Sequence, residues 1–338
     1  MKPETYIVTG GAGFIGSNFI RMALAERPDL RIVTLDLLTY AGNLQNLADI
    51  PKDRHTFVRA DITDPEAVRA AIPEGADAVL NFAAESHVDR SILGPLAFVR
   101  TNVLGTQVLL DAARARSVKR FLQVSTDEVY GSLAPDDPAF TEATPLDPSS
   151  AYAASKTGAD LLVLAAFKTF GYDVVITRCS NNYGPYHFPE KFIPLAITNA
   201  LEGKSIPVYG DGRQVRDWIY VDDHARAILA VAEKGRAGRV YNIGARSERF
   251  NIDVVREILR QLGSPESLIQ YVKDRPGHDR RYAMNSARIE AELGWRPRVT
   301  FEQGLAATIR WFRENTDWWQ RVKDGTYREF YEKWYGDR

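Results

Sequence analysis

The sequence has little of what secreted, membrane-spanning or metal-binding proteins need. Its single cysteine, Cys179, cannot form an internal disulfide, which fits a reducing cytoplasm. The chain has no apolar run of about 18 residues and no signal-peptide pattern after Met1, so we expect neither a membrane span nor export. Its five histidines lack the close spacing of metal ligands, so we also expect no metal site.

The sequence also lacks an excess of either charge. With 43 basic and 44 acidic residues the net charge is −1, which argues against a nucleic-acid or membrane-surface partner. Hydrophobic residues make up 45% of the 338 residues and charged ones 26%, as in an ordinary globular chain. This length is enough for one large domain or two interleaved ones.

A glycine-rich turn stands near the start of the chain. A short apolar run at 5–9 predicts a buried strand, Gly10, Gly13 and Gly16 follow at once, and an amphipathic helix is predicted to about residue 26. After a strand and before a helix, glycines at this spacing allow a tight turn and let a pyrophosphate approach the backbone closely. The pattern therefore predicts a dinucleotide site.

An acidic residue indicates which dinucleotide binds. The next predicted strand, at 31–35, ends at Asp36, about 20 residues after Gly16. A carboxylate there accepts hydrogen bonds from the ribose hydroxyls and repels the extra phosphate of NADP, which favours NAD. Asp36 as a simple turn residue at the end of the strand stays open as the alternative.

Strands and helices then alternate along the chain. Apolar runs at 57–60, 78–82, 120–124 and 174–178 predict further strands, with long helices at about 96–116 and 151–170. This order predicts an α/β fold with a Rossmann-type, doubly wound parallel sheet. The turn-rich span 131–150 is predicted to be a long loop over the site.

The character of the chain changes after residue 180. We expect an NAD-binding domain at 1–180, to which 217–245 return, and a smaller, mostly helical substrate domain at 181–216 and 246–338. Two arginines and a lysine in the smaller domain suggest an anionic substrate. Arg216 or Arg275 taken alone could equally be solvated surface.

The chemistry is predicted at the end of the strand at 120–124. In an open α/β sheet ligands bind at the carboxyl ends of strands, where Thr126, Asp127 and Glu128 follow. Tyr152 and Lys156 lie four positions apart, on one face of the next helix. An ammonium lowers the pKa of a nearby phenol, so Tyr152 could take a proton from a substrate hydroxyl while hydride leaves the same carbon.

The adjacent carboxyls add what a simple oxidation does not need. Two neighbouring carboxyls repel as ions, so one can stay protonated as an acid while the other acts as a base, which suits loss of water. Taken alone, the acidic pair could be a loop or a helix start, and the Tyr-Lys pair a solvated helix face.

Five motifs together resemble the extended short-chain dehydrogenase/reductases, and within them the dTDP-glucose 4,6-dehydratases, from end to end of the chain. The motifs are the glycine turn at 10–16, Ala-Ala-Glu-Ser-His at 83–87, Ser-Thr-Asp-Glu-Val-Tyr-Gly at 125–131, Tyr152-x-x-x-Lys156 and Asn-Asn-Tyr-Gly-Pro at 181–185. The discriminating one is Thr-Asp-Glu at 126–128, because the related 4-epimerases typically lack the acidic pair.

The resemblance implies an NAD-dependent hydro-lyase of nucleotide-sugar and deoxysugar metabolism that makes dTDP-4-keto-6-deoxyglucose from dTDP-glucose. Tyr152 would take the 4-hydroxyl proton as hydride passes to NAD, with Lys156 holding the ribose. Glu128 would then remove the proton of carbon 5 and Asp127 protonate the leaving 6-hydroxyl, before the hydride returns to carbon 6. Thr126 completes the implied catalytic set.

The resemblance also implies contacts. Those to NAD are Gly10, Gly13, Phe14, Ile15, Gly16, Asp36, Leu37, Leu38, Thr39, Asp61, Ile62, Ala83, Ala84, Glu85, Ser86, Thr101, Tyr152, Lys156 and Asn182. Those to the substrate are His87, Thr126, Asn181, Lys191, Phe192, Ile193, Pro194, Leu195, Ala196, Pro207, Val208, Tyr209, Arg216, Asn251, Asp274, Arg275, Pro276, Gly277 and His278.

The resemblance further implies a homodimer, formed by the helices at about 96–116 and 151–170; both could instead simply pack on their own sheet. Two other functions stay open. One is a dehydratase or 4-epimerase acting on a UDP-linked sugar, and the other is a non-catalytic NAD-binding sensor with the same fold.

Overall fold

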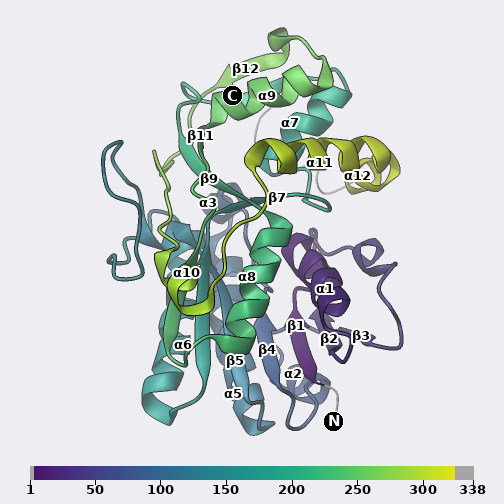
Figure 1. Cartoon of the computed structure of the whole chain (residues 1–338), viewed down its shortest axis with the longest axis vertical. Helices are drawn as coiled ribbons and strands as arrows, with labels where there is room; N and C mark the ends of the chain where they lie inside the picture. Colours follow the sequence, from purple (N-terminus) through teal and green to yellow (C-terminus); the bar gives the residue numbers. More distant parts are fainter. Residues whose placement is uncertain (1–3, 324–338) are drawn as a thin grey trace.

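A parallel sheet of seven strands forms the centre of the computed structural model, which describes residues 4–323 (Figure 1). Every neighbouring pair in this sheet is parallel. In order across the sheet the strands are β10 (Arg239–Ile243), β6 (Val174–Cys179), β5 (Arg120–Thr126), β4 (Ala78–Asn81), β1 (Thr5–Thr9), β2 (Arg31–Asp36) and β3 (His55–Arg59). The order reverses between β1 and β4, the place where such sheets bind ligands at their carboxyl ends.

Helices cover both faces of the sheet. α1 (Phe14–Glu26) and α8 (Val221–Lys234) bury their apolar sides on one face. α2 (Pro65–Ala71), α5 (Gly105–Ala115) and α6 (Ala151–Phe170) do so on the other. The doubly wound fold predicted from the alternation of strands and helices is confirmed.

Helix α6 carries strong start and stop signals. The Ser150 hydroxyl accepts a hydrogen bond from the Ala153 amide at 3.1 Å, and Gly171 ends the helix at a φ of 65°, which suits glycine. The cap places Tyr152 and Lys156 in the first two turns, where both are buried.

The long helix predicted at about 96–116 is wrong in one respect, because it is broken. α4 (Pro95–Phe98) is followed by a π-helical segment, Val99–Leu104, and only then by α5. Within the segment, the Asn102 side chain forms two hydrogen bonds of 2.9 and 3.0 Å with the backbone of Glu85, and a third of 2.8 Å with Ser155. These hydrogen bonds join the segment to the loop after β4 and to α6. Because their partners are distant in the sequence, a local pattern does not reveal the π-helical break.

A smaller unit covers the carboxyl end of the sheet. It has a three-stranded and a two-stranded sheet with their own hydrophobic core. Its elements are β7 (Asn181–Tyr183), α7 (Phe192–Leu201), β8 (Ile206–Tyr209), β9 (Val215–Tyr220), β11 (Glu248–Phe250), α9 (Asn251–Leu262), β12 (Ile269–Val272), α11 (Phe301–Glu314) and α12 (Thr316–Lys323). α10 (Ala287–Leu293) instead packs beside β10 and α8. Strand β9 spans the predicted boundary between 216 and 217.

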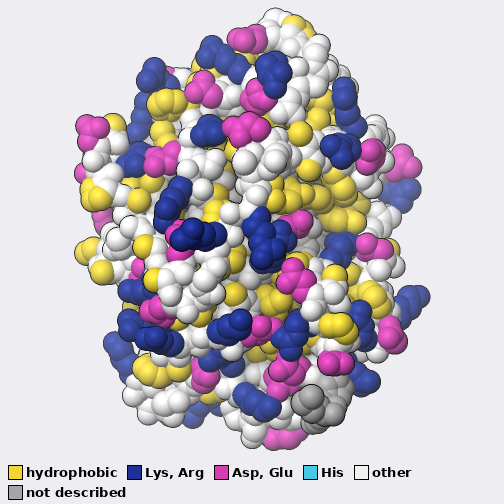
Figure 2. Space-filling view, in the orientation of Figure 1, with side chains coloured by type: hydrophobic (Ala, Val, Ile, Leu, Met, Phe, Trp, Pro, Cys, Tyr) yellow, Lys and Arg dark blue, Asp and Glu magenta, His cyan; other side chains and the backbone are white. Residues whose placement is uncertain are grey.

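Acidic and basic side chains are interspersed over the face seen in Figure 2, without a large area of one sign. Among residues 4–323, no helix is both long enough and apolar enough to cross a membrane. In the same part of the chain, no group of three His, Cys, Asp or Glu side chains could hold a metal ion. Met1 and the end of the aromatic-rich tail, residues 324–338, lie outside the described residues.

Candidate active site

The glycine turn after β1 packs closely against neighbouring backbone. Gly10 has a φ of 66°, and a Cβ there would come within 2.7 Å of the Ala83 amide nitrogen. A Cβ on Gly16 would collide with the Gly10 carbonyl. No side chain caps α1 at Gly13, so the first amides of this helix can receive a pyrophosphate.

Asp36 ends β2 beside this turn. One carboxylate oxygen accepts from the Ala12 amide at 2.9 Å and the other from the Leu38 amide at 2.8 Å. Burial raises the pKa of Asp36, and these two backbone hydrogen bonds oppose that effect. Leu38, with a φ of 59°, packs against the core of the sheet and does not line the cleft, unlike Leu37 and Thr39.

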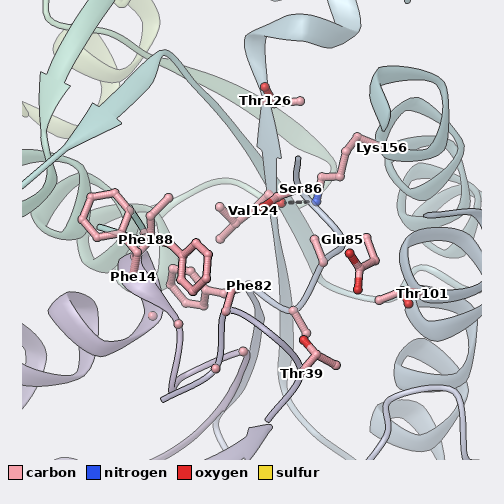
Figure 3. A pocket seen from close by; sticks show the side chains of 18 of the residues that line it. Phe14, Thr39, Phe82, Glu85, Ser86, Thr101, Val124, Thr126, Lys156 and Phe188 are labelled. Atoms are coloured by element: carbon pink, nitrogen blue, oxygen red, sulfur yellow. Dashed lines mark hydrogen bonds between the residues drawn. The ribbon is translucent and has the colours of Figure 1, made fainter. Parts of the chain in front are cut away.

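A single cleft of about 360 Å³ brings most of the predicted residues together (Figure 3). Phe14, Phe82 and Phe188 form one wall in this view, and Glu85, Thr126 and Lys156 lie across from them. The predicted residues that line this cleft are Gly10, Gly13, Phe14, Ile15, Gly16, Asp36, Leu37, Thr39, Asp61, Ile62, Ala83, Ala84, Glu85, Ser86, Thr101, Thr126, Asp127, Glu128, Tyr152, Lys156, Asn181, Asn182 and Lys191.

The acidic pair lies in a helical turn at the end of β5. The Thr126 hydroxyl caps this turn by accepting from the Glu128 amide at 3.3 Å, and it lies 3.2 Å from Oδ1 of Asp127. Asp127 is only 2% exposed, and its Oδ2 has no hydrogen-bond partner among the described residues. Glu128 is less buried and lines the cleft.

The two carboxyls have different electrostatic surroundings. Burial and the neighbouring Glu128 raise the pKa of Asp127 well above its usual range. Burial also raises the pKa of Glu128, but Arg275, Lys191 and Arg216 all oppose that rise. Burial therefore makes both carboxyls harder to ionise than free ones, and the cations act against this more at Glu128 than at Asp127.

Lys156 is buried beneath the cleft. Its ammonium donates to the Val124 carbonyl at 2.7 Å, the bond drawn in Figure 3. Burial lowers the pKa of Lys156, whereas Asp160, one turn further along α6, raises it. Asp160 is itself held by Arg178 at 2.9 Å.

The pKa of Tyr152 is not lowered as the sequence predicted from the nearby Lys156. Burial raises the pKa of Tyr152 well above its usual range and the Glu128 carboxylate raises it further, while a hydrogen bond with Thr126 has the opposite effect. The physical reason for the difference is that the tyrosine is desolvated and that the lysine ammonium is bonded to Val124.

The predicted substrate residues fall into two groups. Cations surround Glu128: Lys191 donates to the Ser86 carbonyl at 2.7 Å, and Arg275 pairs with Asp89 at 2.7 Å. His278 and Tyr209 lie close by, with ring centroids 5.6 Å apart. In contrast, Ile193, Pro194, Leu195 and Ala196 are buried in α7, two of them, Ile193 and Ala196, in the core of the smaller unit. The predicted substrate residues that do not line the cleft are His87, Phe192, Ile193, Pro194, Leu195, Ala196, Pro207, Val208, Tyr209, Arg216, Asn251, Asp274, Arg275, Pro276, Gly277 and His278.

Several cleft residues were not identified from the sequence. The His187 ring stacks on Phe14, with centroids 4.1 Å apart and planes at 11°. Tyr40, Arg100, Phe188, Glu190 and Trp218 also line the cleft. His187 to Glu190 directly follow the Asn-Asn-Tyr-Gly-Pro turn, and this position was the signal available in the sequence.

Comparisons with known proteins agree on one family. The family model described as GDP-mannose 4,6 dehydratase matches residues 7–308. A dTDP-glucose 4,6-dehydratase of Xanthomonas campestris pv. campestris is 54% identical, over 96% of this chain and 97% of the relative. The solved dTDP-glucose 4,6-dehydratase DesIV of Streptomyces venezuelae, with NAD and TYD bound, is 51% identical with a TM-score of 0.92, over 94% of this chain and 100% of that one.

The epimerases are more distant. UDP-glucose 4-epimerase of Thermotoga maritima, solved with UDP-glucose, is 28% identical with a TM-score of 0.85, over 92% of this chain and 99% of that one. The fold is therefore shared by both kinds of enzyme, while the higher identity and the Asp127-Glu128 pair lie on the dehydratase side. By sequence, structure and family model, the chain belongs to the dTDP-glucose 4,6-dehydratases of the extended short-chain dehydrogenase/reductase family.

Proposed function

We propose that the chain converts dTDP-glucose to dTDP-4-keto-6-deoxyglucose, using NAD within each turnover. The observation that carries this proposal is the pair Asp127 and Glu128, held in one cleft with Tyr152 but in unequal electrostatic surroundings, since more cations act on Glu128 than on Asp127. A simple oxidoreductase needs a group that handles one hydroxyl proton. Elimination of water needs an acid and a base in addition.

The cleft fits NAD. The uncapped start of α1 suits the pyrophosphate, and the Asp36 carboxylate suits the ribose. Ala83 and Ala84 offer a flat, small-residue wall, and Lys156 is the cation beneath it. NAD held by these residues would supply the hydride chemistry, as acceptor from carbon 4 and donor to carbon 6.

Tyr152 is assigned the 4-hydroxyl proton. Its phenol oxygen would accept this proton while the hydride leaves carbon 4. Thr126 supports the phenolate by its hydrogen bond with Tyr152. The new 4-keto group makes the hydrogen on carbon 5 acidic.

Glu128 is assigned the proton of carbon 5 and Asp127 the leaving 6-hydroxyl. The three cations around Glu128 oppose the rise of its pKa by burial and so favour the carboxylate that accepts the proton. Asp127 is kept protonated by burial and by Glu128 itself, so its proton is available to the departing oxygen. The two assignments are linked, since the Glu128 carboxylate is one of the groups that raise the pKa of Asp127.

The smaller unit is assigned the nucleotide part of the substrate. Lys191, Arg216 and Arg275 all act on Glu128 and come from segments within 181–216 and 246–338. Guanidinium groups suit the diphosphate of a nucleotide sugar. We therefore retain residues 1–180 with 217–245 as the NAD-binding domain and the remainder as the substrate domain, except that β9 belongs to the substrate domain and α10 packs on the NAD-binding domain.

The direct test is substrate conversion. Purified protein is incubated separately with dTDP-, UDP- and CDP-glucose, each carrying labelled hydrogen on carbon 4, and the products are examined by NMR. We expect a 4-keto-6-deoxy product from dTDP-glucose with the label on carbon 6. A 4-epimer that keeps the label on carbon 4 would contradict the dehydratase, and preference for UDP-glucose would contradict the assigned base.

The pH dependence of kcat is expected to be bell-shaped. Glu128 must be ionised, and because burial raises its pKa above 4.5, activity is lost as the pH falls through that raised value. Asp127 must be protonated, and because its pKa is raised well above 3.8, activity is lost as the pH rises through that value. Arg275→Gln removes a cation that lowers the pKa of Glu128, so the acid limb should move to higher pH.

Arg280→Gln is the matched control for this shift. Arg280 pairs with Asp211 at 2.9 Å, and both side chains are largely exposed. Its removal should leave both limbs in place. Equal shifts in the two variants would mean that the overall charge of the protein, not the position of Arg275 near Glu128, sets the acid limb of the pH profile.

We also propose that the chain forms a homodimer through α6 and the segment from α3 (Val88–Leu93) to α5. Large apolar side chains on these elements are exposed, with Leu96 81% and Leu161 54% accessible. Such exposure over neighbouring helices is what a second copy of the same surface would cover.

A double charge substitution tests this proposal. Leu96→Glu with Leu161→Glu should change a dimer to a monomer, because a dimer would bury both carboxylates without partners. Light scattering after size-exclusion chromatography gives the mass of each form. The same two-charge change at exposed Leu44 and Tyr271 is the control and should leave the parent's mass unchanged. A parent that is already monomeric would contradict the proposed dimer.

A further inference from the structure

The peptide unit in the middle of the glycine turn is held on both sides. The Ala12 amide donates to Asp36 at 2.9 Å. The Ala12 carbonyl accepts from the Asn46 side chain at 2.8 Å and from the Asn43 amide at 3.0 Å. This carbonyl shares a planar peptide with the amide of Gly13, the N-cap of α1. These bonds therefore set the direction in which the first turn of α1 faces the cleft.

Asn46 is in turn held by the C-terminal part of the chain. Its Oδ1 accepts from the indole nitrogen of Trp318 at 2.8 Å, across 272 positions of sequence. Asn46 is 1% and Trp318 8% exposed, so water does not readily replace this bond. Trp318 belongs to α12 and packs in the core of the smaller unit. Figure 1 shows α12 on the same side of the molecule as α1.

A second contact joins the same parts. The Tyr186 ring lies 5.9 Å from Trp318 and 4.7 Å from Trp311. The next residue, His187, stacks on Phe14, the first residue of α1. The aromatic cluster around Trp318 thus reaches the glycine turn by two routes, one through Asn46 and one through residues 186–187.

We propose that Trp318 is a positioning residue for NAD: through Asn46 it holds the Ala12–Gly13 peptide so that α1 faces the pyrophosphate and Asp36 faces the ribose. The smaller unit would then help to retain the cofactor as well as bind the sugar nucleotide. This inference rests on the proposed function only in taking NAD as the cofactor.

Trp318→Phe tests the inference with little change in shape. The phenyl ring keeps an apolar side chain in the aromatic cluster, but Asn46 loses its donor and is left with a buried, unpaired oxygen. The loop can relieve this by moving, and NAD must then select the minor, ordered form. We expect the Kd for NAD, measured by calorimetry on NAD-free protein, to rise about tenfold. The KM for dTDP-glucose at saturating NAD should stay unchanged.

Trp319→Phe is the matched control. Its indole nitrogen donates to the Phe312 carbonyl at 2.8 Å. The substitution therefore removes the same kind of hydrogen bond from the same helix, but this bond lies within the smaller unit. Both variants should lower the melting temperature of the NAD-free protein, while only Trp318→Phe should weaken the binding of NAD. Equal weakening by both would mean that Trp318 is merely structural, and would overturn the inference.

Asn46→Ala provides a second variant if Trp318→Phe folds poorly. It removes both hydrogen bonds of the Asn46 side chain, so it should weaken NAD binding at least as much as Trp318→Phe does. Adding Trp318→Phe to Asn46→Ala should then have little further effect on NAD binding. Additive losses would overturn the inference. A parent chain that binds no NAD would overturn the proposed function together with this inference, whereas unchanged NAD binding in Trp318→Phe would overturn this inference alone.

Discussion

Tyr152→Phe is expected to leave bound NAD oxidised when dTDP-glucose is added, and to lower kcat by about 10²- to 10⁴-fold. The substitution removes only the phenol oxygen. The ring still packs edge-on against Phe98, 6.3 Å away, so the fold should be retained. Without the oxygen the 4-hydroxyl proton has no acceptor and the hydride cannot leave. Absorbance of reduced nicotinamide in stopped-flow mixing measures this first step directly.

The control for Tyr152→Phe is another buried tyrosine. Tyr241 lies on β10, where its hydroxyl donates to Glu292 at 2.9 Å, outside the cleft. Tyr241→Phe loses a buried hydroxyl of the same kind, so it should lower stability without changing NAD reduction. Rapid NAD reduction in Tyr152→Phe would mean that another group takes the proton.

The fold was predictable because each strand carries its own signal. The runs that became β1, β2, β4, β5 and β6 are short and apolar, as expected of strands buried on both faces. The glycine turn and Asp36 could be located for the same reason, since both depend on spacing along a short stretch. The break between α4 and α5 could not, because it depends on contacts of Asn102 with Glu85 and Ser155.

The site was predictable in its residues more than in its energetics. Asp127 and Glu128 are adjacent in sequence, but the difference between their pKa shifts depends on Lys191 and Arg275, which are distant in the chain. The hydrogen bond from Trp318 to Asn46 likewise cannot be predicted from a local pattern, since the two residues are 272 positions apart in the sequence. Desolvation is the other missing quantity, and it reverses the expected direction of the pKa of Tyr152.

Glu128→Gln is expected to separate oxidation from elimination. Glutamine has nearly the same shape but cannot accept the proton of carbon 5, so NAD should be reduced on adding dTDP-glucose and then remain reduced. Product formation should fall by about 10²- to 10⁴-fold. Mass spectrometry of the sugar in deuterated water gives a second readout, since exchange at carbon 5 requires the base and should disappear.

Asp127→Asn is the comparison that shows whether the result with Glu128→Gln is specific to Glu128. It removes the acid for the 6-hydroxyl but leaves the base, so hydrogen exchange at carbon 5 should continue while water loss slows. If Glu128→Gln kept the exchange and Asp127→Asn lost it, the two roles would be reversed. If both variants released product at the parent's rate, neither carboxyl would take part in elimination, and the asymmetry of their surroundings would need another explanation.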